Sequence, residues 1–172
     1  REIAAIMGPY VSSKRGLFFT LNHDLFMERH FGSFKSPGVN FFHTDYNGLQ
    51  KKNLQEKDFV ITLPNYSLLE KNINKDIENH VGYSYIKLHG SYGWLGSKGN
   101  NLMAIGHRKE DDTNNEPLLK YYKELFKNYI FSYNKKLFII GYGFGDGHIN
   151  EILIKGIDKF NLKICVINPK QT

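Results

Sequence analysis

The hydrophobic residues of the chain gather in short unbroken runs, separated by segments in which they recur at helical spacing. The unbroken runs predict buried strands at residues 17–21, 83–88, 137–140 and 162–167. After the third run, helical spacing places on one face Ile149, Ile152, Leu153 and Ile157. Strands that are apolar without alternation are typical of a parallel sheet covered on both faces. The pattern therefore predicts an α/β fold, an open parallel sheet with helices on both faces.

Helical spacing also predicts helices at residues 2–10, 23–34, 65–77 and from Pro117 to about Tyr133. The last of these helices carries a broad apolar stripe, which is expected to pack in the core and consists of Tyr121, Tyr122, Phe126, Tyr129 and Ile130. Residues 108–115 are charged and polar and are expected to form the most flexible loop.

Shorter β-like runs complete the pattern. Residues 39–43 and 59–63 are predicted to pair with each other in a small layer outside the main sheet. Residues 92–95 and 102–105 flank a glycine- and asparagine-containing segment, which predicts a β-hairpin.

The composition is that of an ordinary globular protein. With 172 residues, 41% of them hydrophobic, the chain is predicted to form one domain over residues 1–172. It begins at Arg1 and not at a methionine, which indicates a piece of a longer protein. Because no apolar run approaches about 20 residues, no membrane span is expected. The net charge of +6 comes from scattered lysines, which favours a solvated surface over nucleic-acid binding.

Cys165 is the one cysteine of the chain and lies inside an apolar run, so it is expected to be buried. A single cysteine excludes an internal disulfide and any zinc site built from four cysteines. Such cysteine usage favours a reducing, cytoplasmic compartment.

Four glycines between residues 141 and 147 separate the third predicted strand from its helix. A glycine-rich turn between a strand and a helix start brings backbone N–H groups close to a phosphate. The spacing is not G-x-G-x-x-G, because Asp146 stands in the place of the last glycine, where it is expected to be the helix N-cap. A tight strand-to-helix turn without a ligand is the alternative interpretation.

Polar groups follow four of the predicted strands. They are Asn22-His23-Asp24, His89-Gly90-Ser91, the glycine-rich turn and Asn168. In an open parallel sheet the ligand crevice lies outside the carboxyl ends of the strands. The four groups are therefore predicted to converge on one edge of the sheet.

These segments carry a family resemblance. Thr20-Leu21-Asn22-His23-Asp24 resembles the T-x-N-x-D motif of the sirtuin, or SIR2-like, superfamily, and Leu88-His89-Gly90-Ser91 is similar to its catalytic-histidine motif. Residues 140–150 resemble the G-Y-S-F-x-D…N segment of the SIR2-like branch found in bacterial defence proteins, and residues 166–169 resemble the final strand. The resemblance extends from residue 17 to the end and implies a Rossmann-like fold.

The chain departs from the sirtuin pattern in two respects. Sirtuin deacetylases hold a zinc module of four cysteines, which this chain cannot build, so the resemblance is to a non-deacetylase branch. The family's first strand and its G-A-G phosphate loop are not found in the chain, so either they lie upstream of Arg1 in the full protein or this form has lost them.

The resemblance implies that NAD is cleaved between nicotinamide and ribose, as in SIR2-like NADases, in bacterial antiphage defence. Asn22 and His89 would be catalytic, because an amide can orient a water or ribose hydroxyl and a histidine can accept its proton. Asp24, the third residue implied in catalysis, would position Asn22 or its loop. The residues implied in NAD binding are Thr20, Gly141, Tyr142, Gly143, Gly145, Asp146 and Asn168. No metal is implied.

Two other classes of function stay open. A SIR2-like fold without its first loop can bind ADP-ribose or another nucleotide as a sensor, or serve as an oligomerisation module without turnover. A nucleic-acid-associated domain rests on the net charge alone. The partners implied are NAD or a related nucleotide, further domains of the parent protein and a second copy of the chain in a homo-oligomer, without a membrane.

Overall fold

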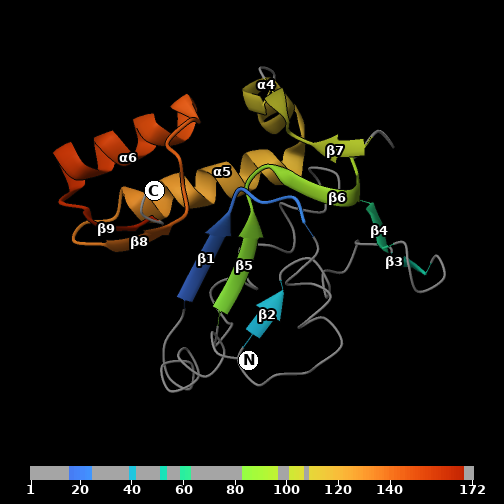
Figure 1. Ribbon diagram of the computed structural model, residues 1–172, viewed down its shortest axis with the longest axis horizontal. Coiled ribbons are helices and arrows are strands. Elements are labelled where there is room, and N and C mark those ends of the chain that lie inside the picture. The colour runs from blue at the N-terminus through green and yellow to red at the C-terminus, as the bar shows by residue number, and fades with distance from the viewer. Residues whose placement is uncertain are drawn as a thin grey trace. The chain divides into compact units, whose positions relative to one another are not determined.

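The computed structural model describes residues 16–24, 39–41, 51–53, 59–62, 83–96, 101–106 and 109–168. Helices and strands are mixed, and most of the strand pairs are parallel, as the predicted α/β class requires (Figure 1). The chain divides into two compact units, Arg1–Tyr122 and Lys123–Thr172, called here the N-terminal and C-terminal units. No helix in the described ranges is long and apolar enough to cross a membrane.

A three-stranded parallel sheet forms the centre of the N-terminal unit. Strand β5 (Tyr83–Lys87) lies between β1 (Gly16–Thr20) and β2 (Val39–Phe41) and pairs in parallel with both (Figure 1). Its Tyr85 and Ile86 are buried, because a strand with a neighbour on each side lies inside the sheet. The elements predicted at residues 17–21 and 83–88 are confirmed as strands, but residues 17–20 of β1 are half-buried and not buried as predicted.

A second sheet in this unit has the order β3-β4-β6-β7. Its strands are β3 (Lys51–Asn53), β4 (Phe59–Thr62), β6 (Gly90–Leu95) and β7 (Asn101–Met103). Strands β6 and β7 form the predicted antiparallel hairpin. The predicted pairing of residues 39–43 with 59–63 is wrong, since β2 pairs with β5 whereas β4 pairs with β3 and β6. Short runs carry no information about their partners, which tertiary context decides.

The prediction of a loop at residues 108–115 is also wrong, because most of this segment forms helix α4 (Lys109–Asn115). The segment has no apolar stripe, and its buried position is a polar one, Thr113. Asp111 and Asp112 lie near the start of the helix, where the helix dipole favours negative charge. A helix of this kind is invisible to a search for hydrophobic periodicity.

Helix α5 (Pro117–Ile130) confirms the long helix that begins at Pro117. Proline suits the first helical position, where its missing N–H has no partner to lose. The helix ends three residues earlier than predicted, and Asn134 beyond it has a left-handed conformation, with φ at 61°. Tyr122, Phe126 and Ile130 of the predicted stripe are buried, whereas Tyr121 and Tyr129 are half-buried. Leu118 and Leu119 are buried in addition.

The C-terminal unit contains a parallel pair of strands and one further helix. Strand β8 (Lys136–Ile140) leads through the glycine-rich turn into α6 (Gly147–Phe160), and β9 (Lys163–Ile167) then pairs with β8. Helix α6 buries three of the four predicted positions, whereas the fourth, Ile157, is half-exposed. The strands predicted at residues 137–140 and 162–167 are confirmed as strands, but β9 is not buried as predicted, since Val166 and Ile167 are 46% and 51% exposed.

Burial of β8 on both faces is not confirmed. Ile139 is buried, but Phe138 and Ile140 are 67% and 71% exposed, so β8 is covered on one face only. Cys165 lies opposite Phe138 in the register and is exposed, which corrects the prediction that it is buried. An unbroken apolar run is typical of a strand covered on both faces, but tertiary context decides which faces are covered.

Gly156 in α6 has no room for a side chain. A Cβ atom there would lie 2.4 Å from Cγ2 of Ile130 and 3.0 Å from Cδ2 of Leu162. We expect Gly156→Ala to lower the free energy of unfolding by about 1–3 kcal/mol through overpacking, although alanine has the better helix propensity. Urea unfolding measures this change. Gly147→Ala, where a Cβ meets no atom within 4 Å, is the matched control, and a stabilised Gly156→Ala protein would contradict the packing described.

Some predicted elements cannot be compared with the structure. The helices predicted at residues 2–10 and 65–77 lie outside the described residues, as does all but the first two residues of the helix predicted at 23–34.

Candidate active site

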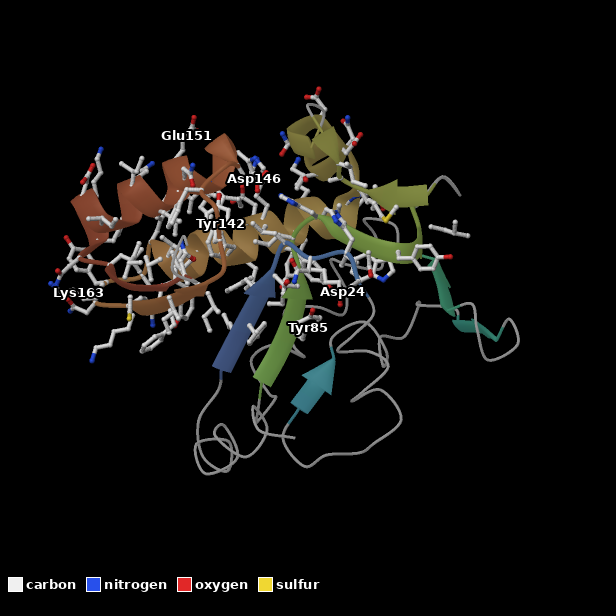
Figure 2. The ribbon with its side chains drawn as sticks, in the orientation of Figure 1. Asp24, Tyr85, Tyr142, Asp146, Glu151 and Lys163 are labelled. Atoms are coloured by element: carbon white, nitrogen blue, oxygen red, sulfur yellow. The ribbon has the colours of Figure 1, made fainter. Side chains whose placement is uncertain are left out.

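The carboxyl ends of β1 and β5 lie side by side in the N-terminal unit. Thr20 is opposite Lys87 in the parallel register, and the backbone N–H of Leu88 donates to the carbonyl of Thr20 at 3.0 Å. The two polar segments that follow these strands therefore begin next to each other. Figure 2 shows Asp24 beyond the end of β5, on the segment that follows β1.

Hydrogen bonds shape the segment of residues 20–24. The hydroxyl of Thr20 accepts a bond from the backbone N–H of Asn22 at 3.1 Å, so this side chain folds the turn itself. The carbonyl of His23 accepts two bonds, from the N–H of Tyr92 at 2.9 Å and from the hydroxyl of Ser91 at 3.2 Å. Asn22 and Asp24 are exposed. Asn22 therefore presents an exposed side-chain amide on a turn that these hydrogen bonds hold in place.

His89 lies in the turn between β5 and β6 and is 1% exposed. Its ring lies beside that of His23, with 6.3 Å between centroids and 25° between planes. The carbonyl of His89 accepts a bond from the N–H of Ala104 at 2.9 Å, which ties the turn to the segment after β7. The structure therefore brings the predicted residues Thr20, Asn22 and Asp24 into one neighbourhood with His89.

Gly90 must be a glycine for two reasons. Its φ is +77°, a conformation that side chains disfavour. A Cβ atom would also lie 2.5 Å from the carbonyl oxygen of Leu102. The close approach of β7 thus fixes the backbone directly after His89.

Lys87 is a site residue that sequence reasoning missed. It ends β5 and is fully buried, and its amino group donates to the carbonyl of Asp24 and to the hydroxyl of Ser91, the latter at 2.7 Å. The sequence feature that could have identified it is a lysine at the end of an apolar strand, directly before the histidine motif. Lysine is almost never fully buried unless it is paired, and here its amino group is paired with Asp24 and Ser91.

The predicted nucleotide-binding turn lies in the C-terminal unit, between β8 and α6, with Tyr142 and Asp146 on it (Figure 2). Gly141 has φ at +66°, and its N–H donates to the carbonyl of Ile167 at 2.9 Å. A Cβ atom at Gly141, Gly143 or Gly145 would meet no atom within 4 Å. The turn therefore presents open backbone, which a ligand can approach closely.

Asn150, in the first turn of α6, holds the glycine-rich turn in place through two hydrogen bonds of its side chain. Its Oδ1 accepts from the Tyr142 hydroxyl at 2.9 Å, and its Nδ2 donates to the carbonyl of Phe144 at 2.7 Å. Burial raises the pKa of Tyr142 above its usual value, so the hydroxyl stays a donor at neutral pH. Asn150 is the last residue of the motif at residues 140–150, and the sequence alone predicts no role for it.

Two further predicted residues flank the turn. Asp146 occupies the N-cap position of α6 as predicted, but its side chain makes no capping hydrogen bond. The amide of Asn168 donates to the carbonyl of Tyr142 at 3.4 Å and is exposed. The structure thus brings the glycine-rich turn and Asn168 together in the C-terminal unit. Convergence of all four strand ends on one edge stays a prediction.

The part of the chain that the structure describes contains no group of three or more histidine, cysteine, aspartate or glutamate side chains able to hold a metal ion. The described site residues supply an amide, an imidazole, carboxylates, an amino group and backbone N–H groups.

Comparison with known protein families matches the chain to the family model of the SIR2-like domain over residues 16–170. Comparison with curated proteins gives no match. The matched region begins with β1 and ends beyond β9, so it contains every predicted site residue from Thr20 to Asn168.

Proposed function

Because the chain belongs to the SIR2-like domain family, we propose that it binds NAD and hydrolyses the bond between nicotinamide and ribose. The observation that carries this proposal is the anchoring of the Asn22 turn beside the His89 turn at the adjacent ends of β1 and β5. An amide and an imidazole held in one neighbourhood can serve one reacting centre. The same family membership supports a Rossmann-like arrangement of the sheet.

The reaction breaks the C–N bond between ribose and nicotinamide, and the bonding electron pair leaves with the neutral nicotinamide. The ribose carbon then carries positive charge, as in the oxocarbenium-like transition states of glycoside hydrolysis. Water forms the new C–O bond and gives ADP-ribose. Asn22 orients this water or a ribose hydroxyl, and His89 accepts the proton. Asp24 positions the segment that carries Asn22.

The glycine-rich turn supplies the proposed contacts to the rest of NAD. Its open backbone at Gly143 and Gly145 allows N–H groups to approach the pyrophosphate or the adenosine, whereas Gly141, whose N–H is bonded to Ile167, contributes open space. Tyr142 and Asp146 belong to the same fastened turn. The exposed amide of Asn168 is suited to a ribose hydroxyl. Thr20 contributes by shaping the Asn22 turn.

We further propose that the protein acts in bacterial antiphage defence, in the cytoplasm. The support is the segment of residues 140–150, whose pattern resembles that of SIR2-like defence proteins. Hydrolysis of NAD consumes a cofactor that every cell needs, so such an activity requires a trigger. Further domains of the parent protein or a homo-oligomer would supply the control.

The burial of His89 favours a second candidate function. A histidine that is 1% exposed can be a structural residue, and a SIR2-like domain with such a histidine can bind ADP-ribose or NAD without turnover. The domain would then be a nucleotide sensor. Both candidates use the same open glycine-rich turn, so binding alone does not separate them.

Product analysis separates them. The full-length protein is incubated with NAD, and the products are identified by chromatography. Hydrolysis of the proposed bond gives nicotinamide and ADP-ribose in equal amounts. Nicotinamide mononucleotide and AMP would instead show cleavage of the pyrophosphate and contradict the proposal. Unchanged NAD together with saturable binding of ADP-ribose would establish the sensor.

A further inference from the structure

Lys87 joins the two turns that carry Asn22 and His89. Its side chain is fully buried at the end of β5, where a polar group costs stability unless it is hydrogen-bonded. Two of its contacts are hydrogen bonds, to the carbonyl of Asp24 on the segment after β1 and to the hydroxyl of Ser91 at the start of β6, just after the His89 turn. The amino group therefore spans the gap between the segment after β1 and the segment after β5.

Ser91 extends this link. Its oxygen accepts from Lys87 at 2.7 Å, and its hydroxyl donates to the carbonyl of His23 at 3.2 Å. The N–H of Tyr92 donates to the same carbonyl at 2.9 Å. Two consecutive carbonyls, those of His23 and Asp24, are thus held from the opposite turn. They follow Asn22 directly, so the links fix the backbone that carries its amide.

We propose that Lys87 is a positioning residue of the active site, which with Ser91 holds Asn22 at a fixed place relative to His89. This inference rests on the function proposed above and assigns a residue to it. Lys87 is buried and acts through the turns that it joins. The effect of losing it falls on the chemical step, because a displacement of about 1 Å can cost about 100-fold in rate.

Two substitutions test the link. Lys87→Met keeps a side chain of similar length and removes the N–H donors. Ser91→Ala removes only the hydroxyl between Lys87 and His23. We expect kcat for nicotinamide release by the full-length protein to fall about 10- to 100-fold in both variants, with KM for NAD changed less than kcat. Lys159→Met, on the exposed face of α6, is the matched control and should keep the wild-type kcat.

Hydrogen exchange at single amides gives a readout that needs no activity. The N–H of Tyr92 bonds to His23, whereas the N–H of Ala104 bonds to His89 and that of Lys163 to Lys135. In both variants we expect exchange at Tyr92 to rise about tenfold or more while the other two amides keep their rates, because only the link between the turns opens. Equal acceleration at all three would show a general structural role and overturn the proposal.

The two measurements distinguish a failure of this inference from a failure of the proposed function. If the wild-type protein releases no nicotinamide, the proposed function fails and the assignment of Lys87 to an active site fails with it, whereas exchange at Tyr92 still reports whether the two turns are linked. If the wild type is active and both variants keep its kcat, the proposed function stands and the positioning role is overturned. Should Lys87→Met fail to fold, Ser91→Ala alone decides, since it leaves the buried amino group in place.

Discussion

Replacement of His89 by alanine in the full-length protein should lower the rate of nicotinamide release from NAD by about 100- to 10,000-fold, the range that a general base contributes. An imidazole is suited to accept a proton near neutral pH. The wild-type rate should fall at acid pH, because a protonated imidazole cannot accept the proton. The residual rate of His89→Ala should lack this dependence. Initial rates between pH 5 and 8 measure both effects.

A second variant controls for the fold, since His89 is buried and alanine leaves a cavity. His89→Gln keeps much of the volume and the hydrogen-bonding capacity but does not titrate. It should unfold at nearly the wild-type temperature and lose activity as His89→Ala does. A His89→Gln protein with the wild-type rate and pH profile would show that the histidine is structural.

Replacement of Asn22 by alanine should lower nicotinamide release by about 100- to 1,000-fold, as the loss of one well-placed polar group at a developing charge does. The side chain is exposed, so the free energy of unfolding should change by no more than about 0.5 kcal/mol. The turn itself should persist, because Thr20 bonds to the backbone N–H of residue 22 and not to its side chain. The loss should appear in kcat, measured with saturating NAD.

Asn128→Ala is the matched control for this substitution, since Asn128 is likewise exposed but lies on α5. It should keep the wild-type kcat. A similar loss in both variants would point to a general effect on the protein, and full activity of Asn22→Ala would remove Asn22 from the catalytic residues.

The neighbourhood of Asn22 and His89 could be predicted because it depends on one rule of parallel sheets. Apolar runs identified β1 and β5, and the carboxyl ends of parallel neighbours share an edge. The register then places Thr20 opposite Lys87, so the polar residues that follow each strand meet. The motif residues can therefore be found without any knowledge of side-chain packing.

Lys87 could not be predicted in the same way, because its burial depends on the Asp24 carbonyl and the Ser91 hydroxyl that meet it in the folded chain. A lysine at the end of a strand is more often solvated. The same limit explains α4, whose buried residue is a threonine, and the pairing of β2 with β5, which no local pattern encodes. Exposure of Phe138 likewise depends on what covers each face of β8.

The most direct test of the account is the rate of nicotinamide release by the double variant Asn22→Ala/His89→Ala beside the wild type and both single variants. Residues that act as a unit at one reacting centre give losses that are strongly non-additive. The account predicts that the wild type releases nicotinamide and that the double variant is about as slow as the slower single variant. Losses that multiply, or a wild-type protein that binds ADP-ribose but releases no nicotinamide, would contradict it.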